Sequence, residues 1–112
     1  MPITNPNYSE INHEEMAASI GLKVKHMPML IASFLEESTP ILVTLSAQVS
    51  ANDYEGIRLS AHSLKGSAAN LRFKELAEMG KELEHAAEAS DGSFDYAAYL
   101  DAMTKAVSTI VV

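Results

Sequence analysis

The sequence predicts an all-α fold, an up-and-down four-helix bundle with a short extra helix at its N-terminal side. Hydrophobic residues make up 47% of the 112 residues, whereas aromatic residues make up only 6% and tryptophan is absent. The core must therefore be built from aliphatic side chains, a composition that favours helices packed on helices. Apolar positions recur at spacings of three and four, and strand-like alternation is confined to the tail at 110–112.

The first predicted element is a short helix behind a loose lead-in. Residues 1–8 hold two prolines and two asparagines, a turn-rich composition that predicts little regular structure. Ser9 is a candidate N-cap and Gly21 a candidate stop. A helix from Ser9 to about Ile20 is therefore expected.

A long second helix is predicted from Pro28, a residue suited to the first turn of a helix, to Val49. Pro40 lies inside this helix and is expected to kink it, because proline removes a backbone donor and crowds the preceding turn. Asn52 and Asp53 then read as a turn, with Asp53 capping a third helix.

The third helix carries the clearest amphipathic pattern. Its apolar residues recur at spacings of four, three, four and three: Ile57, Ala61, Leu64, Ala68 and Leu71. A break near Arg72 leads to a fourth helix.

The buried side of that helix is predicted to hold Leu76, Met79, Leu83 and Ala87. The Ser-Asp-Gly-Ser loop at 90–93 separates it from a last helix. The apolar residues of the last helix are Phe94, Tyr99, Leu100, Met103, Val107 and Ile110.

Composition and charge argue against several classes of function. The formal net charge is −7 and the eight basic residues are scattered, so a nucleic-acid partner is not expected. The absence of cysteine excludes disulfides and thiolate metal sites. Apolar stretches are short and residues 1–10 lack the layout of a signal peptide, so neither a membrane span nor export is expected. The expectation is one cytoplasmic domain over residues 1–112.

The most informative residue of the third helix is His62, which points away from the apolar stripe. Arg58 lies at i−4, Lys65 at i+3 and Gly66 at i+4, with Ala69 a further turn on. An ordinary imidazole is largely neutral near pH 7, so a ring nitrogen can attack phosphorus without a helper base. A nearby cation would stabilise the resulting anion. Gly66 costs about 1 kcal/mol relative to alanine within a helix, which close approach of a partner would explain.

Each of these residues also has an ordinary explanation. One histidine among four on a surface is usually only solvated, and Arg58 and Lys65 alone would be ordinary surface charges. Gly66 alone could be a packing glycine where two helices cross. The joint pattern favours a function. In addition, Arg58, Lys65 and Arg72 are spaced by sevens and form a basic line that would suit a partner with an acidic pocket.

The segment Ala61–Leu71, Ala-His-Ser-Leu-Lys-Gly-Ser-Ala-Ala-Asn-Leu, closely resembles the signature of histidine-containing phosphotransfer (HPt) domains. These domains are the intermediate carriers of bacterial multistep phosphorelays. Segments 34–40 and 75–84 resemble the family's long second helix and the helix after the histidine. The resemblance covers nearly the whole chain from about Met16. Arg72 departs from the pattern, in which a small residue, commonly glycine, often follows the leucine.

The resemblance implies a monomeric carrier without ATP-dependent kinase activity of its own. His62 would accept a phosphoryl group from a receiver-domain aspartate and pass it to an aspartate of another response regulator. Lys65, with Arg58 as further support, would neutralise that group. The expected contact surface for the partner comprises Leu59, Gly66, Ala69 and Arg72. A hybrid histidine kinase would lie upstream, and the receiver would supply Mg²⁺, so no cofactor or metal is expected in this chain.

Three other functions are alternatives to a phosphoryl carrier. The dimerisation domain of a histidine kinase needs an ATP-binding domain, and no phosphate-cradling glycine cluster is present. Glu82 and His85 match the Glu-x-x-His spacing of di-iron bundles, but that chemistry needs a second copy. A helical adaptor that binds receiver or kinase domains without phosphotransfer stays open, although the intact His62, Lys65 and Gly66 argue against it.

Overall fold

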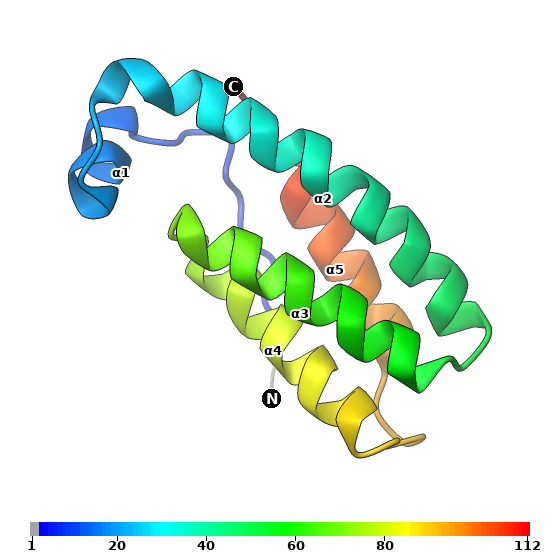
Figure 1. The fold of residues 1–112 in the computed structure, drawn as a ribbon. Helices are drawn as coiled ribbons and strands as arrows, with labels where there is room; N and C mark the ends of the chain where they lie inside the picture. Colours follow the sequence, from blue (N-terminus) through cyan, green and yellow to red (C-terminus); the bar gives the residue numbers. More distant parts are fainter. Residues whose placement is uncertain (1–2) are drawn as a thin grey trace.

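The computed structural model describes residues 3–112, and the regular elements in this range are all helices (Figure 1). The α-helices are α1 (His13–Ile20), α2 (Met27–Ser50), α3 (Tyr54–Asn70), α4 (Lys74–Glu88) and α5 (Tyr96–Ser108). A short 3-10 turn, Val24–His26, precedes α2. The predicted all-α bundle with a short leading helix is confirmed.

The helix α1 is shorter than the sequence predicts. It begins only after Asn12, whose side chain accepts a hydrogen bond from the backbone N–H of Glu15 at 3.1 Å. Ser9, the expected N-cap, lies in a turn before the helix. The predicted stop is correct, because Gly21 ends α1 with φ 82°, a left-handed conformation that glycine adopts without steric cost.

The helix α2 runs as one element through Pro40, and Pro28 occupies its first turn as predicted. One residue before Pro40, the hydroxyl of Thr39 donates to the carbonyl of Leu35 at 2.8 Å. The kink expected at Pro40 stays a prediction. The N-terminal end of α3 follows the sequence closely, since Asp53 accepts from the N–H of Gly56 at 3.1 Å.

The hydrophobic core lies between α2, α3, α4 and α5. The predicted stripe of α3 is buried throughout: Ile57, Ala61, Leu64, Ala68 and Leu71. The predicted side of α4 is buried as well: Leu76, Met79, Leu83 and Ala87. Because the outer side of α3 is thereby fixed, the core determines which residues of that helix face a partner.

The segment Val24–Ser50 has the length and the mean hydropathy, 1.2, of a helix that could cross a membrane. A core helix of a water-soluble bundle meets the same criterion, so this is weak evidence. In α2 the apolar side chains of Ile31, Phe34 and Leu45 are buried against the other helices. The absence of a membrane span stays an expectation.

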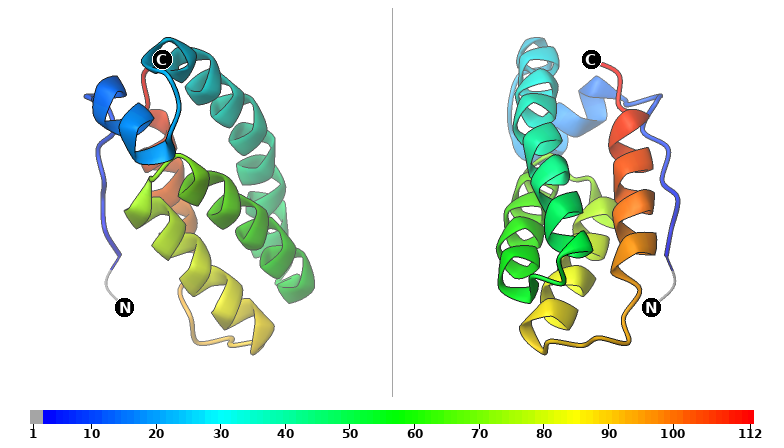
Figure 2. Two further views of the ribbon diagram at one scale, coloured as in Figure 1. Left: turned by 60° about the vertical axis from the view of Figure 1, so that its left-hand side comes forward. Right: turned by 90° about the vertical axis from the view of Figure 1, so that its right-hand side faces the viewer.

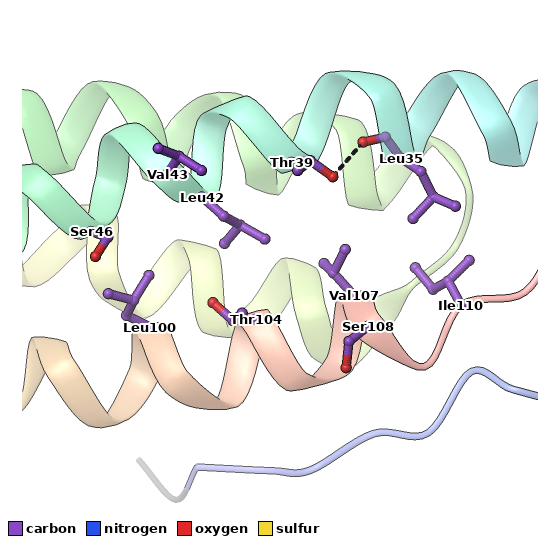
Figure 3. Close-up of a pocket in the computed structure, with 10 residues that line it drawn as sticks. All are labelled: Leu35, Thr39, Leu42, Val43, Ser46, Leu100, Thr104, Val107, Ser108 and Ile110. Carbon is purple, nitrogen blue, oxygen red and sulfur yellow. Dashed lines mark hydrogen bonds between the residues drawn. The ribbon is translucent and has the colours of Figure 1, made fainter.

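An open, apolar groove of about 580 Å³ lies between α2 and α5 (Figure 3). Leu35, Leu42 and Val43 line it from α2, and Leu100 and Val107 from α5. The polar groups among its lining residues are serine and threonine hydroxyls. The helices α2 and α5 contact each other less extensively than α3 and α4 do.

The lead-in is held to the bundle at Tyr8. Its ring lies 4.5 Å, centroid to centroid, from that of Phe73. Its backbone N–H donates to the hydroxyl of Thr109 at 2.8 Å, and its own hydroxyl accepts from the N–H of Leu76 at 3.3 Å. The prediction that residues 1–8 are loose is therefore wrong at Tyr8, while the first two residues lie outside the described range. Figure 2 shows the lead-in running along the bundle beside α5.

Candidate functional site

His62 stands in the middle of α3, on the side opposite the buried stripe, and its side chain is 64% exposed. Gly66 and Ala69 follow on the same side and are exposed. Leu59 precedes them and is 54% exposed, a large apolar side chain in contact with water. The third helix thus presents a histidine on a ridge of small and apolar residues, as the sequence predicts.

The histidine has a carboxylate partner that its own helix does not reveal. Nδ1 of His62 lies 2.7 Å from Oε2 of Glu84 in α4, and the other oxygen of Glu84 accepts from Nζ of Lys65 at 2.5 Å. Glu84 is only 9% exposed. One nearly buried carboxylate therefore bridges a histidine and a lysine that lie three residues apart on α3.

Hydrogen bonding keeps Glu84 ionised despite its burial. Burial alone would raise the pKa of the Glu84 carboxyl, but the hydrogen bonds from Lys65 and His62 together lower the pKa below its ordinary value of 4.5. An ionised carboxylate can only accept hydrogen bonds. In the neutral ring of His62 the hydrogen therefore sits on Nδ1, and Nε2 keeps its lone pair. No hydrogen bond from another described residue reaches Nε2.

Both cations that the sequence places one turn from His62 are paired with carboxylates. Lys65 binds Glu84, and Arg58 binds the exposed Glu55 within α3. The expected basic line from Arg58 to Arg72 is therefore largely neutralised at its first two positions. Sequence spacing places these cations on one face of the helix, but it does not show which of them has an acidic neighbour.

Arg72, which departs from the family pattern, has a left-handed backbone conformation with φ 63°. This conformation costs a non-glycine residue about 1–2 kcal/mol, which explains why glycine suits the position. The guanidinium group of Arg72 donates to the carbonyl of Ala69 at 3.2 Å and to the carbonyl and hydroxyl of Ser19 at 3.3 and 3.1 Å. These hydrogen bonds link the end of α3 to α1.

The structure separates the two explanations offered for a glycine beside the histidine. A Cβ at Gly66 would meet nothing within 4 Å, so Gly66 is not needed for helix packing within the chain. The glycine that lets α4 pack on α3 is Gly80, where a Cβ would lie 3.2 Å from Cβ of Lys65 and 3.3 Å from the carbonyl oxygen of Ala61. A glycine in the interior of α4, one turn before Glu84, is the sequence signal that could have identified this contact.

The residues considered for a di-iron site do not gather. Glu82 is half-buried and His85 is exposed on α4. Across residues 3–112, no group of three or more histidine, cysteine or acidic side chains is arranged to hold a metal ion.

The bundle displays His62 as an exposed histidine held by a carboxylate that also binds a lysine, an arrangement suited to carrying a phosphoryl group on histidine. The family model of the Hpt domain matches residues 29–110, and the chain therefore belongs to the Hpt domain family.

The chain is similar to histidine-containing phosphotransfer protein B (HptB) from Pseudomonas aeruginosa PAO1, known from a crystal structure. The two are 26% identical, the match covers 94% of this chain and 88% of the other, and the TM-score is 0.76. A comparison with curated proteins gives no match. The resemblance seen in the sequence is confirmed, and with it a histidine phosphotransfer carrier of phosphorelays.

Proposed function

We propose that Nε2 of His62 accepts a phosphoryl group from a receiver-domain aspartate and passes it to an aspartate of another response regulator. The observation that carries this proposal is the hydrogen bond between Nδ1 of His62 and Glu84. Within residues 3–112, which include all four histidines, His62 is the one paired with a carboxylate. That pairing leaves the nucleophilic nitrogen free and fixes the tautomer.

The chemistry needs no proton transfer at the histidine. The lone pair of Nε2 forms a bond to phosphorus while the bond from phosphorus to the aspartyl oxygen breaks, and the aspartate leaves as a carboxylate. The phosphorylated ring keeps its hydrogen on Nδ1 and becomes cationic, a charge that Glu84 stabilises across 2.7 Å. In the onward step an aspartate oxygen attacks phosphorus, the P–N bond breaks, and the ring returns to its neutral form.

Lys65 acts on this reaction through Glu84. Its ammonium group holds one carboxylate oxygen at 2.5 Å, which orients the other oxygen toward His62. Direct neutralisation of the phosphoryl group, the role expected from the family, would require Lys65 to leave Glu84. Arg58 is committed to Glu55 and contributes less.

The partner would dock on the exposed ridge of α3. Gly66 and Ala69 leave the ridge low beside the histidine, and Leu59 adds an apolar contact. The receiver would bring the Mg²⁺ and the aspartate, and a hybrid histidine kinase would feed the first receiver. In this proposal the carrier works as a monomer in the cytoplasm.

The proposal is tested by intact mass spectrometry after treatment with phosphoramidate, with wild type and His62→Gln side by side. We expect one acid-labile phosphoryl adduct on wild type and none on the variant. An adduct on both proteins would move the acceptor to His13, His26 or His85. No adduct on wild type, either from phosphoramidate or from a phosphorylated receiver, would instead support the adaptor without phosphotransfer.

A further inference from the structure

A shallow hollow of about 400 Å³ lies beside the candidate site, between α3 and α4, which run side by side (Figure 1). Four of the eight basic residues of the chain line it: Lys65, Arg72, Lys74 and Lys81. Glu78 is the acidic residue of its lining. These five side chains sum to +3, which leaves −10 on the rest of a chain whose net charge is −7.

Most of this positive charge is uncompensated. Lys65 is paired with Glu84, but the ion pairs formed within the described part of the chain include none to Arg72, Lys74 or Lys81. The hydrogen bonds of Arg72 go to neutral groups of Ala69 and Ser19, so its charge stays open to a partner.

Two of the cations occupy positions that local stability disfavours. Arg72 has a left-handed backbone, and Lys74 lies in the first turn of α4, where the helix dipole disfavours a cation. Arg72 offsets part of this cost through its hydrogen bonds to Ser19 and Ala69, whereas Lys74 forms no ion pair with another described residue. A residue that breaks a local rule without a compensating contact in the fold commonly serves a function.

We propose that this basic hollow receives an acidic surface element of the receiver domain and thereby orients the receiver over His62. The inference rests on the proposed function and adds a specificity-determining surface to it. The hollow is continuous with the expected docking ridge, because Ala69 belongs to both and Lys65 reaches from the hollow to Glu84.

Charge gives the physical reason. A partner that presents an aspartate and its acidic surroundings is repelled by most of a chain with net charge −7, and it is attracted at the hollow. Attraction at the hollow and repulsion by the rest of the acidic surface orient the receiver as it approaches. A larger share of the encounters then places its aspartate near His62. Such steering acts on the association rate and is screened by salt.

The test compares two doubly substituted proteins with the same net charge. Lys74→Gln/Lys81→Gln removes two exposed cations of the hollow, and the control Lys23→Gln/Lys105→Gln removes two exposed cations outside its lining. Each protein is loaded with phosphoramidate and mixed with the purified bacterial receiver domain that accepts phosphate fastest from loaded wild type. Second-order transfer rates are measured in about 0.01 M and about 1 M salt, where the Debye lengths are about 30 and 3 Å.

We expect the hollow variant to transfer about tenfold more slowly than wild type at low salt and the control to change by less than about twofold. The difference should vanish at high salt, and loading by phosphoramidate should be unchanged. Equal slowing of both variants, no slowing, or slowing that persists at high salt would each overturn the inference. Slower loading by phosphoramidate would also overturn it, by showing that the cations act on small anions at His62.

Failure of the proposed function has a different signature, namely wild type that carries no phosphate from any source. In that case docking is tested by measuring the Kd between the receiver domains and wild type, the hollow variant and the control over the same salt range. A selective, salt-dependent weakening in the hollow variant would uphold the surface, and a lack of binding to wild type would remove it.

Discussion

Gly80 of α4 lies so close to Lys65 of α3 that a Cβ on the glycine would come within 3.2 Å of the lysine Cβ. The missing side chain lets the two helices approach at this level. Glu84 lies one turn further along the same side of α4 and reaches both Lys65 and His62 from there. The geometry of the histidine thus depends on how closely the two helices pack.

Substitution of Gly66 and of Gly80 by alanine should have opposite effects on stability. Gly66→Ala adds a methyl group in open space and should raise the free energy of unfolding by about 1 kcal/mol, the helix-propensity difference. Gly80→Ala gains the same propensity but presses on the backbone of Lys65 and Ala61, so it should lower stability by about 1–3 kcal/mol, as overpacking does. Urea denaturation measures both.

Gly66 and Gly80 are expected to have different roles: Gly66 leaves space for the partner, and Gly80 lets α3 and α4 pack closely. Gly66→Gln should leave the fold intact and slow transfer to a receiver, because its side chain fills the space beside His62. Undiminished transfer in Gly66→Gln would show that the partner does not need the space beside His62. A stable Gly80→Ala with an unchanged site would show that the close approach of α3 and α4 is not required.

Replacement of Glu84 should slow phosphorylation of His62 without preventing it. Glu84→Gln keeps an acceptor for Nδ1–H but loses the charge, and a charge-assisted hydrogen bond exceeds a neutral one by about 1 kcal/mol, so loading by phosphoramidate should fall about fivefold. Glu84→Ala should also shift the neutral ring away from its Nδ1–H tautomer, which ¹⁵N NMR of the imidazole detects. An unchanged tautomer in Glu84→Ala would show that Glu84 does not position the ring.

The stability of the fold should depend on Glu84 in acid. Because the folded-state pKa of Glu84 lies below 4.5, its ionised form stabilises the fold above that pH, and the contribution is lost as the pH falls through the lowered pKa. Wild type should therefore lose more unfolding free energy than Glu84→Gln between about pH 5 and pH 2. Denaturant titrations of both proteins at several pH values make the comparison. A pH-independent difference between them would contradict it.

The left-handed conformation of Arg72 should make glycine more favourable than alanine at this position, the reverse of their order inside a helix. Arg72→Gly and Arg72→Ala both lose the hydrogen bonds to Ser19 and Ala69, so the difference between them isolates the backbone. With φ 63°, the glycine variant should be the more stable by about 1 kcal/mol in thermal or urea unfolding. A more stable alanine variant would show that residue 72 leaves this conformation.

Removal of one buried hydroxyl should stabilise the protein. Ser38 in α2 is fully buried, and its Oγ has no hydrogen-bond partner among the described residues. Ser38→Ala should therefore raise the free energy of unfolding by about 1–2 kcal/mol. The control Ser33→Ala, on the exposed side of the same helix, should gain only about 0.5 kcal/mol from propensity. Equal gains would show that the Ser38 hydroxyl is satisfied in solution.

Local signals predicted some elements well and others poorly. The buried stripe of α3 follows from the spacing of its apolar residues, and the start of α3 follows from the capping side chain of Asp53. Both signals depend on a few neighbouring residues. The start of α1 was misplaced because Ser9 and Asn12 are both good caps, and propensity does not choose between them. The composition of residues 1–8 predicts a loose segment. Tyr8 nevertheless packs on Phe73, which lies 65 positions later in the chain and which local composition does not reveal.

By itself the sequence determined the helical class and the outward position of His62, because the period of a helix fixes which residues share a face. Only the tertiary structure decided that Glu84 holds the imidazole, that Lys65 is paired, and that four cations meet in one hollow. These relations join α3 to α4, and they depend on the distance and register between two helices. Contacts at Gly80 set that distance, and although the glycine is visible in the sequence, its neighbours on α3 are decided by how the two helices pack.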